Sequence, residues 1–248
     1  MRLLGIFRLC RAAGAIYLQL VFGPCILIGL YLLLLSQSLR AQETKIDSSY
    51  ANWYYQQRMA YFEQSAVVKG AIVFLGNSIT ERAEWQELLA GSKYPVLNRG
   101  IGGDNSFGIL ARIDEALRGR PRAIFLMDGI NDQFRKLPQE VSVNNYKRII
   151  RRIKEMSPKT IVYLQSALPI NEELTKEPYT KGRNVLVPAL NAKLRQLAAD
   201  ENIPFVDLCP LFQDSDGKLS VKYSSDGVHL IPCAYIKWVQ LLKEKKYL

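Results

Sequence analysis

The chain has 248 residues, of which 48% are hydrophobic and 23% are charged, a composition that excludes a disordered or low-complexity protein. The formal net charge is +10, from 33 basic and 23 acidic side chains. The sequence contains a single histidine, His229, which excludes metal sites built from several histidines, such as an HExxH helix. An enzyme of this sequence that relies on an imidazole must therefore use His229.

Residues 1–41 are typical of a leader. Arg2, Arg8 and Arg11 precede an apolar run over residues 12–35, a pattern found in cleaved signal peptides and in uncleaved membrane anchors. Both alternatives stay open, and possible membrane attachment would run through residues 12–35. In either case the basic residues tend to stay in the cytoplasm, so we expect residues 42–248 to form one extracytoplasmic domain, which is secreted, periplasmic or anchored.

Beyond the leader, short apolar runs alternate with amphipathic segments. In chain order we expect a helix at 48–64, a strand at 71–75, a strand at 95–97, a helix at 106–118, a strand at 123–127, a helix at 141–156, a strand at 160–165, a helix at 185–199, a strand at 204–206 and a helix at 234–245. Uninterrupted apolar strands that alternate with helices predict a parallel sheet covered on both faces. Ligands of such sheets bind beyond the carboxyl ends of the strands, so the residues that follow each strand are the candidates for chemistry.

The helix predicted at 141–156 has a strongly basic face, which includes Arg151, Arg152 and Lys154. A solvated surface and a nucleic-acid patch both fit this pattern. The basic residues are not interleaved with aromatic ones, and the chain is expected to be exported, so we expect no nucleic-acid partner. Cys209 and Cys233 could form a disulfide in an oxidising compartment, although spacing alone does not show that they are close.

Polar residues follow three of the predicted strands and precede the last helix. Ser78 is placed as a nucleophile or as a helix cap. Gly103 offers a bare backbone N–H or a tight turn, and Asn131 offers a side-chain amide or a turn. Asp226 lies three residues before His229 and can orient its ring. The four blocks read Gly76-Asn77-Ser78-Ile79-Thr80, Gly100-Ile101-Gly102-Gly103-Asp104, Gly129-Ile130-Asn131-Asp132 and Asp226-Gly227-Val228-His229.

These four blocks, in this order, resemble those of the SGNH (GDSL-type) hydrolases over residues 70–245, with similarity to platelet-activating-factor acetylhydrolase-like and carbohydrate O-acetylesterase-like members. The resemblance implies a flavodoxin-like three-layer α/β/α fold with a five-stranded parallel sheet. It implies Ser78 as nucleophile, His229 as general base and Asp226 as its orienting acid. The oxyanion hole would comprise the N–H groups of Ser78 and Gly103 and the amide of Asn131, with no cofactor or metal.

One position departs from the family pattern, since Asn77 stands where these hydrolases usually have aspartate. An asparagine keeps most of the hydrogen bonds of the turn but loses the charge, so we expect activity to survive.

The substrate is less well defined by the sequence. The polar segment 168–183 is either a lid or wall of the crevice or an ordinary surface loop. It has no long apolar run, which argues against a large lipid chain. We expect an exported esterase that removes acetyl or other short acyl groups from a small-molecule or glycan ester. The alternatives are a lysophospholipase or lipid acetylhydrolase, and a non-catalytic carbohydrate-binding or envelope protein.

Overall fold

Five parallel strands form one sheet in the order β2-β1-β3-β4-β5. The computed structural model describes residues 46–248, so the predicted leader and its apolar run at 12–35 lie outside the described residues. The strands are β1 (Ile72–Gly76), β2 (Val96–Gly100), β3 (Ala123–Met127), β4 (Ile161–Gln165) and β5 (Phe205–Val206). Every residue of β1 and β3 is buried, as expected for a parallel sheet with both faces covered. The predicted five-stranded α/β/α fold is therefore confirmed.

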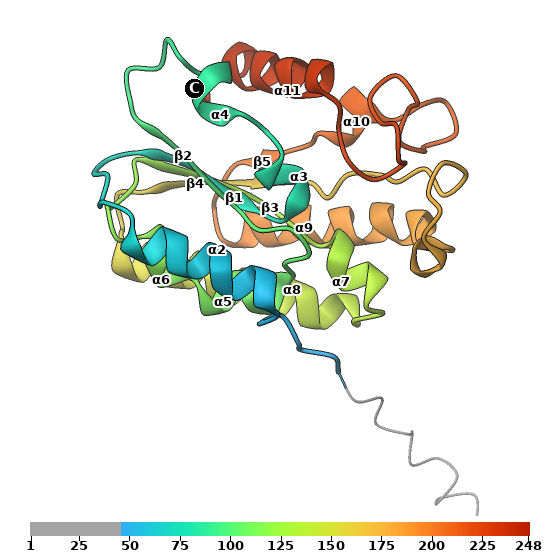
Figure 1. Ribbon diagram of the computed structural model, residues 1–248, viewed down its shortest axis with the longest axis horizontal. Helices are drawn as coiled ribbons and strands as arrows, with labels where there is room; N and C mark the ends of the chain where they lie inside the picture. Colours follow the sequence, from blue (N-terminus) through green and yellow to red (C-terminus); the bar gives the residue numbers. More distant parts are fainter. Residues whose placement is uncertain (1–45) are drawn as a thin grey trace, which may run out of the picture. The chain divides into compact units, whose positions relative to one another are not determined.

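Helices cover both faces of the sheet (Figure 1). On one side lie α4 (Trp85–Leu88) and α11 (Pro232–Glu244), and on the other lie α5 (Ser106–Ala111), α6 (Ile113–Ala116), α8 (Gln139–Met156) and α9 (Val187–Asp200). The apolar positions predicted at helical spacing on α8 are buried at Tyr146, Ile149, Ile150 and Ile153, whereas Met156, the last residue of the helix, is exposed. Burial of this apolar stripe holds α8 against the sheet, because full burial of a branched or aromatic side chain contributes about 1.5–3 kcal/mol to the free energy of folding.

A row of aromatic rings crosses the face of the sheet beneath α4 and α11. Phe74, Phe125 and Tyr163 are register partners on β1, β3 and β4, and their rings stack with centroids 4.9 and 4.6 Å apart. Trp85 of α4 stacks on Phe74 at 3.7 Å and meets Trp238 of α11 edge to face. The row joins the three central strands to the helices above them.

Several helix boundaries differ from the prediction for identifiable reasons. The first described helix, α2 (Trp53–Gln64), begins later than predicted because the Asn52 side chain caps it, accepting from the Tyr55 N–H at 2.9 Å. The predicted helix 106–118 is split at Arg112 into α5 and α6. A short 3-10 turn, Asn184–Leu186, precedes α9, whose first turn contains Pro188. The short helices α3 (Ser78–Glu81), α7 (Ile130–Phe134) and α10 (Cys209–Phe212) were not predicted.

The basic face of α8 noted in the sequence pairs with acidic side chains. On the basic face of α8, Arg151 and Lys154 both pair with Glu201, and Arg152 pairs with Asp114, so this face is balanced by acidic neighbours.

Within residues 46–248, no helix combines the length and apolar character needed to span a bilayer.

The disulfide considered from the sequence is not formed, because both cysteine thiols are free. The Cys209 thiol contacts the Asn191 amide and the Ala167 carbonyl, each at 3.2 Å. Cys233 is exposed beside the Lys222 carbonyl. The two side chains therefore have separate surroundings.

Candidate active site

Ser78 lies at the point where the strand order of the sheet reverses. The chain leaves β1 outward to β2 and then returns to β3 on the other side of β1, so the segments after β1 and β3 diverge and leave a crevice between them. Ser78 is the first residue of α3, and Asn77 separates it from the last residue of β1. The buried Asn77 caps this helix, because its Oδ1 accepts from the Ile79 N–H at 3.0 Å.

His229 and Asp226 form a hydrogen-bonded chain with Ser78. The Ser78 Oγ lies 2.9 Å from the His229 Nε2, and the His229 Nδ1 lies 2.6 Å from the Asp226 Oδ2. The other oxygen of Asp226 accepts from the backbone N–H groups of His229 and Val228 at 2.7 and 2.9 Å. The carboxylate therefore fixes both the ring and the backbone of the turn that carries it. This is the geometry in which a histidine can take the proton of a serine hydroxyl.

The surroundings of these groups favour a neutral imidazole beside an ionised carboxylate. Burial disfavours the charged ring and lowers the pKa of His229 below 6.5, although Asp226 opposes this shift. For Asp226, burial acts to raise the pKa, but the hydrogen bonds from the His229 and Val228 N–H groups and from the imidazole outweigh it and lower the pKa to about 2. At neutral pH His229 can therefore act as a base.

The two further predicted donors lie on the same cleft as Ser78. Gly103 has a φ of +76°, a left-handed conformation that favours glycine over other residues. The Asn131 Nδ2 donates to the Asp104 carbonyl at 2.7 Å, which holds its amide beside the glycine turn. The structure thus brings together Ser78, Gly103, Asn131, Asp226 and His229.

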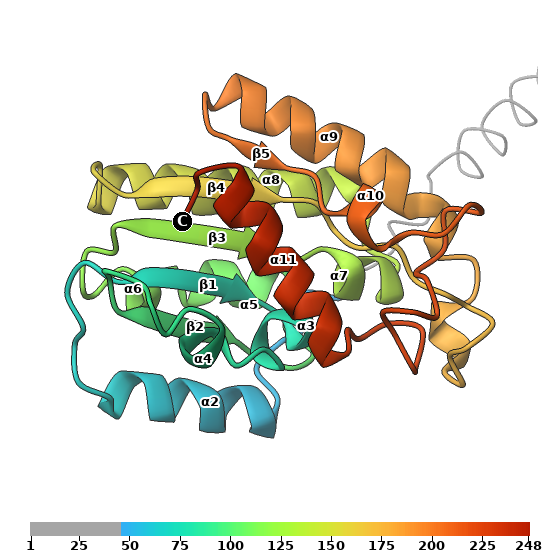
Figure 2. The ribbon, with the colours of Figure 1, turned by 90° about the horizontal axis from the view of Figure 1, so that it is seen from above.

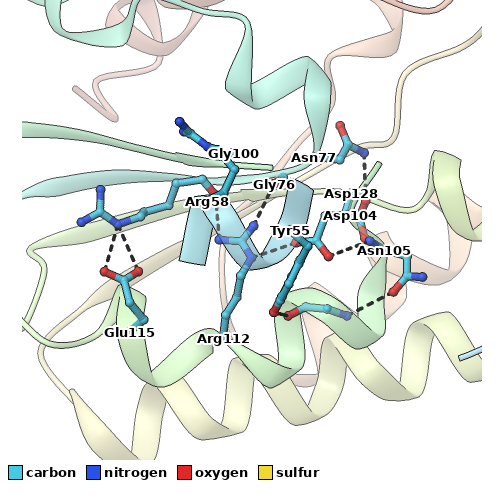
Figure 3. Close-up of polar contacts among 12 residues, drawn as sticks. Tyr55, Arg58, Gly76, Asn77, Gly100, Asp104, Asn105, Arg112, Glu115 and Asp128 are labelled. Atoms are coloured by element: carbon cyan, nitrogen blue, oxygen red, sulfur yellow. Dashed lines mark hydrogen bonds and ion pairs between the residues drawn. The ribbon is translucent and has the colours of Figure 1, made fainter. Parts of the chain in front are cut away.

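A buried ion pair supports the glycine turn from below (Figure 3). The Arg112 guanidinium donates to the Asp104 Oδ2 at 2.8 Å and to the Arg99 and Gly76 carbonyls at 2.9 Å each. The side chains of Arg112 and Asp104 are both 0% exposed. One guanidinium therefore joins the ends of β1 and β2 to the turn that contains Gly103.

Asn77 has a specific partner, Asp128, directly after β3. The Asn77 Nδ2 donates to the Asp128 Oδ1 at 2.8 Å, and both side chains are buried (Figure 3). Burial raises the pKa of Asp128 well above its usual value, and the nearby carboxylates of Asp132 and Asp104 raise it further. The departure from aspartate at position 77 therefore avoids a second acidic group against an already crowded buried carboxyl, while the cap of α3 is kept.

The cleft beside Ser78 has a volume of about 660 Å³. The segment 168–183, described above as a lid, a wall or a surface loop, contributes Leu174, Thr175, Lys176, Glu177 and Tyr179 to its lining. The segment is held in place because the Glu172 carboxylate accepts from the backbone N–H groups of residues 182, 183 and 184, each at 2.8 Å. It therefore forms a wall of the cleft.

Some residues of the cleft were not identified from the sequence. Arg82 lines it one helical turn after Ser78, and its Nη1 lies 3.6 Å from the Asp226 Oδ2. Phe134 packs edge to face against Tyr179 at 5.3 Å. The spacing of Arg82 from Ser78 was a usable signal, whereas the aromatic pair depends on how segment 168–183 folds back.

Within residues 46–248, no group of three or more His, Cys, Asp or Glu side chains is arranged to hold a metal ion.

Comparison with known proteins agrees with this arrangement. Residues 74–235 match the model of the GDSL-like Lipase/Acylhydrolase family. The chain belongs to this family. The chicken (Gallus gallus) protein named platelet-activating factor acetylhydrolase IB subunit alpha2 is 28% identical over 179 residues, which cover 70% of this chain and 74% of that protein.

Two solved structures are also similar to this GDSL-like hydrolase. One, from Streptococcus pneumonia and provisionally described as a platelet activating factor, is 29% identical, with a TM-score of 0.69 over 88% of this chain and 98% of that one. The other, a GDSL-like lipase from Bacteroides thetaiotaomicron, shares the fold at 24% identity, with a TM-score of 0.66 over 78% and 98% of the two chains. The chain is therefore an ester-hydrolysing enzyme of the GDSL-like family.

Proposed function

We propose that this GDSL-like hydrolase is a serine esterase that removes acetyl or other short acyl groups from carbohydrate. The observation that carries the proposal is the chain of hydrogen bonds from Ser78 through His229 to Asp226, which lies in a cleft lined by both polar and apolar side chains. In the proposed reaction, the His229 Nε2 takes the proton of the Ser78 hydroxyl while the Oγ attacks the ester carbonyl carbon.

The tetrahedral intermediate carries a negative charge on the former carbonyl oxygen. We assign its stabilisation to the N–H groups of Ser78 and Gly103 and to the Asn131 amide, each worth roughly 2.7–4 kcal/mol by the measured effect of such donors. The imidazolium then returns its proton to the leaving alcohol oxygen, and an acyl-enzyme remains. Water, deprotonated by His229, hydrolyses the acyl-enzyme and regenerates the Ser78 hydroxyl.

The lining of the cleft supports a short acyl group. Its apolar side chains are Phe134, Leu174, Tyr179 and Val228, and the rest of the lining includes several charged and hydroxyl side chains. A long acyl chain needs continuous apolar cover, because each buried CH₂ contributes about 0.8 kcal/mol only when it leaves water. An acetyl group needs little such cover, and the polar walls suit a hydroxylated alcohol.

The similarity to the chicken protein, an acetylhydrolase by name, supports a second candidate. The alcohol could be a lipid, and the enzyme would then be a lipid acetylhydrolase. In a lysophospholipase the long lipid chain would instead be the acyl group. All these candidates share the same two-step reaction and differ in the acyl group or in the alcohol that leaves.

A chain-length series of p-nitrophenyl esters tests the acyl preference. We expect the highest kcat/KM for acetate, and labelling by a fluorophosphonate probe that is lost in Ser78→Ala. A maximum at eight carbons or more would reject the short-acyl proposal. A wild-type protein that neither reacts with the probe nor hydrolyses p-nitrophenyl acetate would reject the assignment of Ser78 altogether.

A further inference from the structure

The outer face of α2 is a firmly held surface that takes no part in the proposed reaction. On its inner face, Tyr55 and Phe62 are buried against Ile101, and the Tyr55 hydroxyl donates to the Gly108 carbonyl at 3.0 Å. On its outer face, Tyr54 is 40% exposed and Tyr61 is 66% exposed. Two aromatic side chains on a firmly held helix offer contact area to a ligand at a low cost in conformational entropy.

A hollow of about 620 Å³ lies beside this face, and we call it the α2 hollow. Its lining includes the two tyrosines together with Arg58, Glu84, Gln86 and Asn98. Its two arginines and two glutamates have formal charges that cancel. An anionic polymer or lipid surface would require a net basic lining, whereas a mixture of aromatic faces and side-chain donors and acceptors suits a neutral polyhydroxylated ligand.

The α2 hollow lies next to the cleft of Ser78, and Gly102 lies between them. Gly102 lines the cleft, and Tyr54 and Glu81 line the hollow. A Cβ added at Gly102 would lie 3.0 Å from the Glu81 Oε2, 3.3 Å from the Tyr54 Cε1 and 3.9 Å from the Ser78 Cβ. Gly102 is not among the glycines with positive φ, so the missing side chain serves close approach at this position.

Two polar contacts fix this junction. The Tyr54 hydroxyl donates to the Glu81 Oε1 at 2.7 Å, and the Arg58 Nε lies 3.0 Å from the same oxygen. Glu81 is the last residue of α3, the helix that begins with Ser78. In Figure 2, α2 runs along the β2 edge of the sheet, with its N-terminal end near α3. A ligand that leaves the cleft over Gly102 therefore meets the aromatic face of α2.

We propose that the α2 hollow binds the sugar units of an oligosaccharide chain whose acylated unit occupies the cleft. This inference rests on the proposed esterase function and extends it, since it identifies the substrate as a polymeric or oligomeric glycan. Tyr61 supplies a stacking face for a sugar ring, and the polar side chains of the hollow bind its hydroxyl groups.

Kinetics on substrates of different length test the proposal. The substrates are p-nitrophenyl acetate and acetylated mono- and hexasaccharides of xylose, glucosamine or mannose. We expect at least one hexasaccharide to have a kcat/KM about tenfold above that of its monosaccharide. Tyr61→Ala should lower that value roughly fivefold, and Tyr61→Phe should keep most of it. Both variants should hydrolyse p-nitrophenyl acetate as the wild type does.

Trp53→Ala is the matched control, because Trp53 is 72% exposed on the same helix but does not line the hollow. It should leave all substrates unaffected. The inference is overturned if no hexasaccharide exceeds its monosaccharide, or if Tyr61→Ala leaves the hexasaccharide rate unchanged. It is also overturned in favour of a lipid surface if Tyr61→Ala lowers only the hydrolysis of acetyl esters held in phosphatidylcholine vesicles. Failure of the wild type on p-nitrophenyl acetate would instead reject the proposed function itself.

Discussion

Replacing Arg112 by methionine should destabilise the protein far more than a surface charge deletion. The change leaves the Asp104 carboxylate fully buried without its cation and removes the donor from the Arg99 and Gly76 carbonyls. Breaking a buried ion pair costs about 3–5 kcal/mol, and each carbonyl adds on the order of 1 kcal/mol. We therefore expect the free energy of unfolding to fall by about 5–7 kcal/mol, a large part of the ~5–15 kcal/mol typical of a domain.

The assay is urea unfolding followed by circular dichroism, with Arg152→Met as the control. Arg152 also contacts an aspartate at 2.8 Å, in Asp114, but the two side chains are 36% and 60% exposed, so its loss should cost less than about 1 kcal/mol. Adding Asp104→Asn to Arg112→Met removes the stranded charge and should recover part of the stability.

The destabilisation caused by Arg112→Met should also depend on pH. Burial raises the pKa of Asp104 to about 6 even beside Arg112, and loss of the guanidinium raises it further. Because the pKa of the folded state then lies above that of the unfolded chain, protonation of Asp104 favours folding, and stability falls as the pH rises through that pKa. The destabilisation should be larger at pH 8 than at pH 5. Equal losses for Arg112→Met and Arg152→Met, or a larger loss at pH 5, would refute the reasoning.

Three further predictions concern the site. The rate of p-nitrophenyl acetate hydrolysis should rise with pH through a pKa below 6.5, because burial lowers the pKa of His229 and only the neutral ring accepts the Ser78 proton; a limb above 6.5 would contradict this. Asn131→Ala should lower kcat about 10²–10³-fold with a smaller change in KM, and a change in KM alone would argue for a binding role. Asn77→Asp should keep activity within about tenfold, because the new carboxylate still accepts from the Ile79 N–H that caps α3, and the raised pKa of Asp128 favours its neutral form beside the added charge; loss of fluorophosphonate labelling at Ser78 would show otherwise.

The sheet and the placement of the site residues follow from local patterns in the sequence. Each strand is a short apolar run, and the parallel order places the segments after β1, β2 and β3 at one edge. Position therefore predicted that the segments that contain Ser78, Gly103 and Asn131 would meet, whereas the family resemblance assigned the roles of these residues. The Asp226–His229 spacing of three residues likewise predicted a contact within one turn.

The support beneath the site was not predicted, because it joins residues that are distant in the sequence. Arg112 was included in one continuous helix, although it lies on the same stripe as the buried Ile109, Ile113 and Ala116. An arginine on an apolar stripe signals a buried partner, but the sequence does not show which carboxylate that partner is. The bond between Asn77 and Asp128 similarly depends on the pairing of β1 with β3. Such contacts are fixed by the pairing of strands, which local periodicity does not specify.

The aromatic row above the sheet gives the protein an internal optical reporter. Trp85 and Trp238 are fully buried, whereas Trp53 is 72% exposed, and these are the three tryptophans of the chain. In Trp53→Ala all indole fluorescence therefore comes from the buried pair, whose rings lie 5.2 Å apart. The Trp85 indole N–H donates to the Thr80 carbonyl in the helix that begins at Ser78. Any displacement of that helix on acylation would thus be read directly as a change in the emission of the buried pair.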